Sequence, residues 1–292
     1  MKNQKLRRLL AAPELIVAPG AYDAWSARLV EFSGFPVIYM TGYGVSASTL
    51  GQPDIGLITM SEMIAQVRNI SACTSIPLIA DGDTGYGGIL NVVRTVAEYE
   101  TAGASAIQLE DQLFPKRCGH MEGKQLIPQA EMISKIKAAV HARKDPDFVI
   151  IARTDARAVE GFPSALSRAQ AYADAGADVI FFEAPQSVDE MRDVAKTIAK
   201  PLLANMVEKG KTPLLTGKEL TALGFKIAIY PVSALYAATK NVLALLASLK
   251  EQDTTAGFAD GMVSFPQFNE LVGVDKARAL ESSFVEGDEK RQ

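Results

Sequence analysis

The chain has 292 residues, of which 48% are hydrophobic and 22% are charged, as in an ordinary soluble globular protein. Its 30 Lys and Arg against 34 Asp and Glu give a net charge of −4, and the lack of a basic block excludes a nucleic-acid-binding protein. Its two cysteines, Cys73 and Cys118, are too few for a disulfide framework and indicate a reducing, cytoplasmic compartment. The most apolar helical segment, 233–250, contains Lys240 and is shorter than the ~20 residues that a membrane span needs.

Eight short runs of apolar and β-branched residues recur along the chain. Runs that are apolar at nearly every position are typical of strands in a parallel sheet covered on both faces, because neither side of such a strand meets water. The eight expected strands are residues 15–18, 36–40, 77–81, 106–110, 148–153, 178–183, 201–205 and 226–230.

Segments with the periodicity of helices lie in most of the gaps between these runs. They are residues 61–72, 90–102, 128–143, 164–175, 188–199 and 217–223, and we expect Ser61 to cap the first of them. Three of these segments are followed by Gly103, Gly176 or Gly224, as helices commonly are. Eight strand–helix units predict a (β/α)8 TIM-type barrel, and a doubly wound open sheet is the alternative.

Two further helical segments, residues 233–250 and 266–279, follow the eighth expected strand. A barrel is already closed at that point, so we expect these helices to pack elsewhere, on a neighbouring subunit. No low-complexity linker divides the chain. We therefore expect one barrel domain over residues 1–292, with a helical extension from about residue 233.

Polar residues are concentrated where the expected strands end. The last positions of the runs, or those just after them, hold Thr41, Gly42, Asp81, Asp83, Glu110, Asp111, Arg153, Asp155, Glu183, Asn205 and Tyr230. Catalytic groups of TIM barrels lie at the carboxyl ends of the strands, so these residues are candidates for one site. The alternative is that each is an ordinary polar turn residue, which is less probable for so many strands at once.

The segment 81–88 is acidic and then rich in glycine. Asp81 and Asp83 are two positions apart, so both can face the mouth of the barrel where the third strand ends. Mg²⁺ prefers oxygen ligands and commonly uses one or two carboxylates together with water and substrate oxygens. A magnesium site is therefore favoured, with Glu110 after the next strand in support, and a glycine-rich turn with capping aspartates is the alternative.

The loop after the fourth strand combines a thiol with basic residues. Lys116, Arg117 and His120 lie close to Cys118 in sequence, and neighbouring cations favour the thiolate form. Such a thiol can act as a general acid or base on carbon, and Gly119 is expected to leave room for a ligand. The alternative is a small buried hydrophobic residue, which fits a cysteine in a polar loop poorly.

Arg153 ends the fifth apolar run and would point its guanidinium group into the mouth of the barrel. A planar group with paired donors suits the carboxylate of a substrate. The alternative is a structural salt bridge with Glu183 or Asp155, and the two interpretations are compatible.

These motifs together resemble those of the isocitrate lyase and phosphoenolpyruvate mutase superfamily, in its lyase branch. The segment 116–120, Lys-Arg-Cys-Gly-His, is similar to the signature of that branch, and 81–87 is similar to the superfamily's metal loop. Segments 44–48 and 51–54 resemble its second-strand loop, and 152–156 and 230–231 also fit. The resemblance extends from about residue 6 to residue 250, with the motifs in the same order.

The resemblance implies a Mg²⁺-dependent barrel, with Mn²⁺ as a possible substitute, that cleaves or forms a C–C or P–C bond next to a carboxylate. It also implies a homotetramer in which helices after the barrel swap between neighbours. The metal would be bound by Asp81 and Asp83, directly or through water, with Glu110 in support and Asp54 near the metal waters.

The resemblance also implies roles for residues around the substrate. The pocket would be formed by Thr41, Gly42, Tyr43, Gly119, Arg153, Glu183 and Asn205, with Arg153 holding the carboxylate. Cys118 would protonate the carbanion-like product, and Lys116, Arg117 and His120 would stabilise the charge that develops.

Two departures from the family pattern narrow the expected substrate. Phosphonate-forming mutases carry Asn-Ser where this chain has Cys118 and Gly119, and methylisocitrate lyases place an arginine at the position of Tyr236, where it meets a third carboxylate. A tyrosine cannot supply that charge. We therefore expect a 2-hydroxy dicarboxylate of the 2,3-dimethylmalate type, cleaved to pyruvate and a carboxylic acid. The alternatives are cleavage of 2-methylisocitrate to pyruvate and succinate, hydrolysis of oxaloacetate to oxalate and acetate, its decarboxylation, and a non-catalytic barrel that binds 2-oxo acids.

Overall fold

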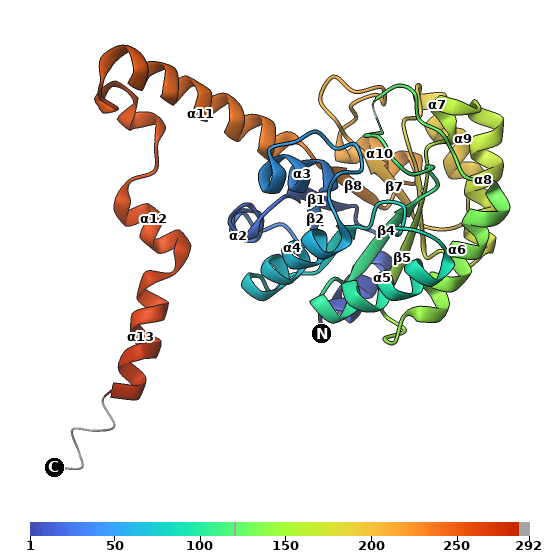
Figure 1. Ribbon diagram of the computed structural model, residues 1–292, viewed down its shortest axis with the longest axis horizontal. Helices are drawn as coiled ribbons and strands as arrows, with labels where there is room; N and C mark the ends of the chain where they lie inside the picture. Colours follow the sequence, from blue (N-terminus) through green and yellow to red (C-terminus); the bar gives the residue numbers. More distant parts are fainter. Residues whose placement is uncertain (120, 286–292) are drawn as a thin grey trace. The chain divides into compact units, whose positions relative to one another are not determined.

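The computed structural model describes residues 1–119 and 121–285. Eight parallel strands close a barrel in the order β1 to β8, and β1 pairs with β8 through Ile16 and Ile227 (Figure 1). The strands are β1 Ile16–Ala21, β2 Ile38–Met40, β3 Leu78–Asp81, β4 Ala106–Glu110, β5 Val149–Thr154, β6 Val179–Phe182, β7 Leu202–Asn205 and β8 Ile227–Tyr230. All eight expected strands are therefore confirmed, and the closed order excludes the open sheet.

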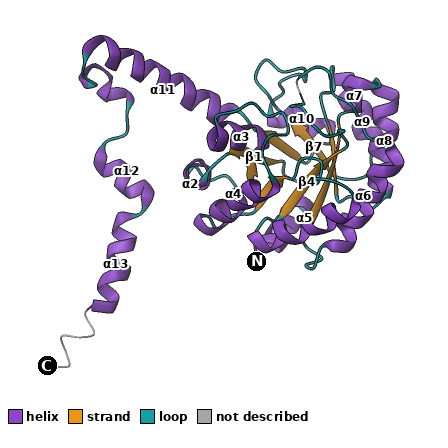
Figure 2. Cartoon of the chain, in the orientation of Figure 1, coloured by secondary structure: helices purple, strands orange, loops and turns teal. Residues whose placement is uncertain are grey.

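Helices surround the strands (Figure 2). Those that the periodicity predicts are α4 Met60–Cys73, α5 Ile89–Ala102, α6 Gln129–Ala142, α8 Phe162–Asp174, α9 Val188–Thr197 and α10 Gly217–Leu223. Four others are not predicted, namely α1 Lys2–Ala11, α2 Ala24–Phe32, α3 Gly42–Leu50 and α7 Ala156–Val159. The expected cap at Ser61 is wrong, because Thr59 caps α4 in a reciprocal arrangement with Glu62.

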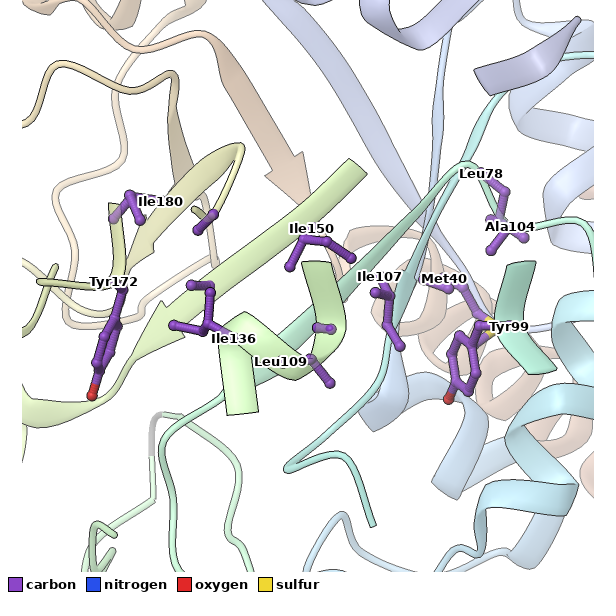
Figure 3. Packing of buried hydrophobic residues seen from close by; sticks show 14 of the residues in the cluster. Met40, Leu78, Tyr99, Ala104, Ile107, Leu109, Ile136, Ile150, Tyr172 and Ile180 are labelled. Carbon is purple, nitrogen blue, oxygen red and sulfur yellow. The ribbon is translucent and has the colours of Figure 1, made fainter. Parts of the chain in front are cut away.

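The apolar side chains form two clusters, one inside the barrel and one between the strands and the helices. Figure 3 shows part of the outer cluster, which includes Met40 of β2, Ile107 of β4 and Tyr99 of α5. The inner cluster includes Leu6 of α1, which is fully buried against residues such as Ile16 at the start of β1. Helix α1 therefore covers the amino end of the barrel, and the carboxyl end is left for a site.

The chain divides into two compact units, residues 1–236 and residues 237–292. Beyond α11, Ser233–Gln252, the second unit holds a short 3-10 helix at Ala256–Gly261, α12 Phe265–Val272 and α13 Val274–Val285. The single helix expected at 266–279 is wrong, because Gly273 adopts a left-handed conformation with φ of 82° and ends α12. Among the described residues, no helix is both long and apolar enough to cross a bilayer.

Candidate active site

The alternation of side chains along each strand determines which residues face the interior of the barrel. In β5, Val149 and Ile151 belong to the inner cluster and Ile150 and Ala152 to the outer one, so Arg153 is the next inward residue. The same alternation in the other strands directs a set of polar side chains inward at the carboxyl end. They are Thr41, Asp81, Glu110, Glu183 and Asn205. The apolar lower barrel thus ends in a ring of polar groups.

A cavity of about 270 Å³ lies at this end of the barrel. Of the predicted site residues that the structure describes, all except Gly42 and Asp83 line it, whereas His120 lies outside the described residues. Gly42 is directly behind the cavity wall, since its N–H donates to Asp81 Oδ2 at 3.3 Å and a Cβ there would be 2.7 Å from that oxygen. The structure therefore brings the predicted set together.

Lys116 is the centre of a buried group of carboxylates. Its Nζ lies 2.5 Å from Asp54 Oδ1 and 2.6 Å from Asp83 Oδ1, and all three side chains are buried. Burial alone would lower the pKa of Lys116, but Asp83, Asp54 and Glu110 outweigh it and raise that pKa well above its ordinary value. Lys116 is therefore a permanent cation within an acidic cluster.

The acidic groups outnumber the cations in this cluster, and their protonation equilibria reflect it. Burial raises the pKa of Asp83 to about 7, opposed by Lys116 and reinforced by Asp81 and Asp54. Burial also raises the pKa of Glu110 well above its ordinary value, although Arg153 opposes this shift. Within the described part of the chain, Glu110 Oε1 is a buried oxygen with no hydrogen-bond partner. A bound divalent cation would satisfy that oxygen and offset the excess negative charge, so the residues fit a magnesium site.

The side chains are not arranged as a finished coordination shell. Among the described residues, no three His, Cys, Asp or Glu side chains are grouped as they would be around a metal ion. The ammonium group of Lys116 occupies the space between Asp54 and Asp83, and Asp83 adopts a left-handed backbone conformation with φ of 48°. Such conformations carry local strain and are concentrated at functional sites.

Arg153 is held by both of the partners that the sequence suggests, and by Glu110. Its Nε and Nη2 donate to the two oxygens of Asp155 at 2.8 and 3.0 Å, while Glu110 and Glu183 lie at 3.5 and 4.0 Å. The guanidinium group also stacks 4.9 Å from the ring centre of Phe181. Arg153 is thus a fixed cation in the cavity wall, and the structural salt bridge is chiefly with Asp155.

The loop that carries Cys118 is anchored at several points. Cys118 N–H donates to the carbonyl of Asp54 at 3.2 Å, and Lys124 Nζ donates to Gly119 O and, at 2.8 Å, to Asp155. Gln112 exchanges hydrogen bonds with the backbone of Arg117 at 2.8 and 2.9 Å. These contacts hold the half-buried thiol in the wall of the cavity.

The contacts of this loop give its glycine and its basic residues defined neighbours. A Cβ at Gly119 would lie 2.4 Å from Arg153 Nη2 and 2.7 Å from Glu183 Oε1, so the absent side chain leaves space for those groups. Lys116 binds the carboxylates of the acidic cluster, and Arg117 donates to Glu122 O at 2.9 Å.

Tyr236 lines the cavity beside Tyr43, with the ring centres 6.3 Å apart and the planes at 85°. Burial and the neighbouring Tyr43 raise the pKa of Tyr236 to about 12, so the phenol is uncharged near neutral pH. Sequence reasoning missed other lining residues, including Tyr39 on β2 and Glu208 and Lys209 after β7. The inward alternation of β2 could have revealed Tyr39, whereas Glu208 and Lys209 lie beyond a strand end and carry no such signal.

Curated relatives match almost the whole chain. A family model described as phosphoenolpyruvate phosphomutase matches residues 6–250. The chain is 52% identical to 2,3-dimethylmalate lyase of Eubacterium barkeri, over 97% of this chain and 98% of that protein. It is 46% identical to 2-methylisocitrate lyase of Aeropyrum pernix, over 92% of this chain and 86% of that protein.

Solved structures agree in fold and extent. An oxaloacetate acetylhydrolase in complex with the inhibitor 3,3-difluorooxalacetate superposes with a TM-score of 0.92 and 38% identity, covering 97% of this chain and 96% of that one. A phosphonopyruvate hydrolase in complex with oxalate and Mg²⁺ superposes with a TM-score of 0.88 and 36% identity, covering 98% and 99%. The chain therefore belongs to the isocitrate lyase and phosphoenolpyruvate mutase superfamily, in its lyase branch.

Proposed function

We propose that this lyase cleaves the C2–C3 bond of a 2-hydroxy dicarboxylate of the 2,3-dimethylmalate type. The products are pyruvate and a carboxylic acid, which is propionate for 2,3-dimethylmalate itself. The observation that carries the proposal is the uncharged Tyr236 in the cavity wall, at the position where the family resemblance implies an arginine in methylisocitrate lyases. The 52% identity to a 2,3-dimethylmalate lyase supports the same substrate class.

The neutral side chain of Tyr236 favours a substrate with two carboxylates. A carboxylate placed there would meet an uncharged phenol in place of a cation. Glu208 and Lys209 line the same cavity with opposite charges, but both are exposed, so water screens them.

The proposed metal is Mg²⁺, with Mn²⁺ as a substitute. Asp81 and Asp83 would hold it, with Glu110 and Asp54 in support, and the buried excess of carboxylates is the physical reason. Bound there, Mg²⁺ would supply Lewis acidity to the 2-hydroxyl and carboxylate oxygens of the substrate. The oxalate and Mg²⁺ of the related phosphonopyruvate hydrolase support this choice.

The side chains that line the cavity bind and orient the substrate. Arg153 binds the carboxylate next to the reacting carbon, and Thr41 and Tyr43 contact the part that becomes pyruvate, with Gly42 behind them. Glu183 and Asn205, whose side chains lie 3.2 Å apart, also line the cavity.

In the cleavage step a carboxylate of the cluster, or a water that it orients, takes the 2-hydroxyl proton. The C2=O bond forms as the C2–C3 bond breaks, and the electron pair moves onto the leaving fragment. Cys118 donates its thiol proton to C3 of that fragment. Lys116, Arg117 and His120 stabilise the negative charge on the fragment before it is protonated.

The assembly proposed from the resemblance is a homotetramer. Large apolar side chains of the second unit, including Phe265 and Phe284, are exposed within that unit, at 79% and 77%. Apolar surface of this kind favours association with another chain. Light scattering on the purified protein would give four times the chain mass of 31.3 kDa, and a monomer mass would contradict the proposal.

Two other reactions have specific support. The 46% identity to a 2-methylisocitrate lyase favours cleavage of the tricarboxylate, and the superposition on an oxaloacetate acetylhydrolase favours hydrolysis to oxalate and acetate. Either reaction could use the proposed metal and Arg153. The third carboxylate of 2-methylisocitrate, however, would meet no cation at Tyr236.

An assay with separate detection of pyruvate, glyoxylate and oxalate decides among them. The enzyme would be given Mg²⁺ and, one at a time, 2,3-dimethylmalate, citramalate, 2-methylisocitrate, isocitrate and oxaloacetate. Pyruvate from 2,3-dimethylmalate, abolished by EDTA and restored by Mg²⁺, is the expected result. Oxalate from oxaloacetate as the main product would replace the proposal with hydrolysis, and bound pyruvate without any turnover would favour a non-catalytic barrel.

A further inference from the structure

A neutral amide, Gln108, lies in the middle of the otherwise apolar barrel interior. It faces inward on β4, between Ala106 of the inner cluster and Glu110, and its side chain is fully buried. A buried amide destabilises a fold unless its donors and acceptor are hydrogen-bonded. The hydrogen-bond partners of Gln108 therefore explain why this residue can lie in the barrel interior.

The two ends of this amide have different partners. Tyr39 Oη donates to Gln108 Oε1 at 2.8 Å, and Gln108 Nε2 donates to Asp81 Oδ1 at 3.2 Å. Burial raises the pKa of Tyr39 well above its ordinary value, so its hydroxyl keeps its proton and acts as the donor. Because the tyrosine donates to the oxygen of the amide, the NH₂ group must face Asp81.

The carboxylate of Asp81 is thereby fixed from three directions. Its Oδ1 accepts from Gln108 and from the N–H of Asp83 at 3.0 Å, while Oδ2 accepts from Gly42 N–H at 3.3 Å. Oδ1 is thus committed to two donors, and the longer bond at Oδ2 leaves that oxygen the more available of the two.

We propose that Gln108 is a positioning residue for the metal ligand Asp81, and that Tyr39 fixes the orientation of the Gln108 amide. The inference rests on the proposed role of Asp81 in holding Mg²⁺. Partners that orient metal ligands typically contribute 10–100-fold in metal affinity or activity, so the effect is measurable.

The chain offers a matched control for a lost tyrosine hydroxyl. Tyr99 is as deeply buried as Tyr39, and its Oη donates at 3.0 Å to the main-chain oxygen of Asp81 and bonds to Tyr86. Tyr99→Phe therefore removes a buried hydroxyl next to the same residue and leaves the carboxylate contacts in place.

The test is a titration of the full-length enzyme with Mn²⁺, with free ion followed by electron paramagnetic resonance and no substrate present. Gln108→Met and Tyr39→Phe are expected to raise the Mn²⁺ Kd about 10-fold or more, whereas Tyr99→Phe stays within about 2-fold. Thermal unfolding of each variant separates this effect from a loss of stability. In steady state, saturating Mg²⁺ should largely restore kcat of Gln108→Met, which a merely structural defect would not allow.

Three results would overturn the inference. The first is a Kd of Gln108→Met and Tyr39→Phe within about 2-fold of wild type. If Gln108→Met does not fold, an unchanged Kd in Tyr39→Phe has the same meaning. The second is an equal rise in Tyr99→Phe, which would indicate a general structural effect. The third is a wild-type enzyme that binds no Mn²⁺. Of the three results, only this one would also overturn the proposed metal site.

Discussion

Cys118 and Cys73 form a natural pair of thiols for testing the proton-transfer step. Cys118 lines the cavity, whereas Cys73 lies at the end of α4, where its Sγ is 3.4 Å from the carbonyls of Ala24 and Ile70. Both are half-buried, so a replacement by serine perturbs packing to a similar degree.

Cys118→Ser should lower kcat at least about 100-fold, because a serine hydroxyl is a much weaker acid toward a carbanion than a thiol. Binding of pyruvate, measured as product inhibition or by calorimetry, should be retained. Cys73→Ser should keep wild-type turnover. A Cys118→Ser enzyme that turns over at the wild-type rate would remove the thiol from the mechanism.

Tyr236→Arg should shift specificity toward the tricarboxylate. A cation at this position would gain a charge-assisted hydrogen bond to a third carboxylate, which is worth about 1.5–3 kcal/mol. The ratio of kcat/KM for 2-methylisocitrate to that for 2,3-dimethylmalate should therefore rise about 10-fold or more. Tyr236→Phe is the control, since it alters the phenol without adding charge. An unchanged ratio in Tyr236→Arg would show that this position does not meet the distal end of the substrate.

At the scale of elements, β5 and the Cys118 loop are joined through one carboxylate. Asp155, just beyond β5, accepts from Arg153 and from Lys124 of the loop, and is fully buried. Burial alone would raise the pKa of Asp155, but Arg153 and Lys124 outweigh it and lower this pKa to about 2.

Asp155→Asn should lower the free energy of unfolding by about 3–5 kcal/mol at pH 7, because two buried cations lose their partner. The folded pKa lies below the ordinary 3.8, so the stabilisation is present above pH 4 and is lost as the pH falls toward 2. Urea unfolding should give the same gap between variant and wild type at pH 7 and pH 5, and a smaller one at pH 3. A gap that widens toward pH 3 would contradict the assignment.

Helix α1 gives a second prediction about an element. Leu6 is fully buried against the inner cluster, so Leu6→Ala should lower the free energy of unfolding by about 2–5 kcal/mol. Leu90→Ala is the control, because Leu90 is 82% exposed, and its effect should stay within about 0.5 kcal/mol. Equal urea midpoints for the two variants would mean that α1 does not close the barrel.

The elements differ in how well the sequence predicts them, for physical reasons. The strands are apolar on both faces, which gives a signal over every residue, and all eight are predicted. Helix α1 is short and rich in Lys and Arg, and its apolar stripe is limited to Leu6, Leu9 and Leu10, so the signal is weak. Helix α3 begins directly at a strand end and consists mainly of small residues, which leaves its periodicity weak.

The apolar runs that predict the strands also predict the site residues at the strand ends. The prediction of site residues fails in the loops and inside the runs, where no such pattern is present. Residues at strand ends, such as Asp81 and Arg153, are brought together because parallel strands end at one rim. Gln108 is missed because it lies inside a run that is otherwise apolar. The partners of Lys116 and Gly119 are also missed, since they depend on how the loop folds back over the barrel.

At the scale of the whole molecule, the fold separates stability from chemistry. The two apolar clusters fill the amino half of the barrel and much of the layer under the helices, whereas most of the buried charged side chains line one cavity at the carboxyl end or bond to residues that line it. A barrel of this kind can hold several related reactions, because the substrate is selected by a few rim residues and not by the core.

The central claim is that this rim selects a 2-hydroxy dicarboxylate over a tricarboxylate. The measurement that tests it most directly is the ratio of kcat/KM for 2,3-dimethylmalate to that for 2-methylisocitrate, with the wild-type enzyme and saturating Mg²⁺. The account predicts a ratio of at least about 10, because the third carboxylate has no cation to replace its hydration. A ratio below one would contradict it and would make this enzyme a 2-methylisocitrate lyase.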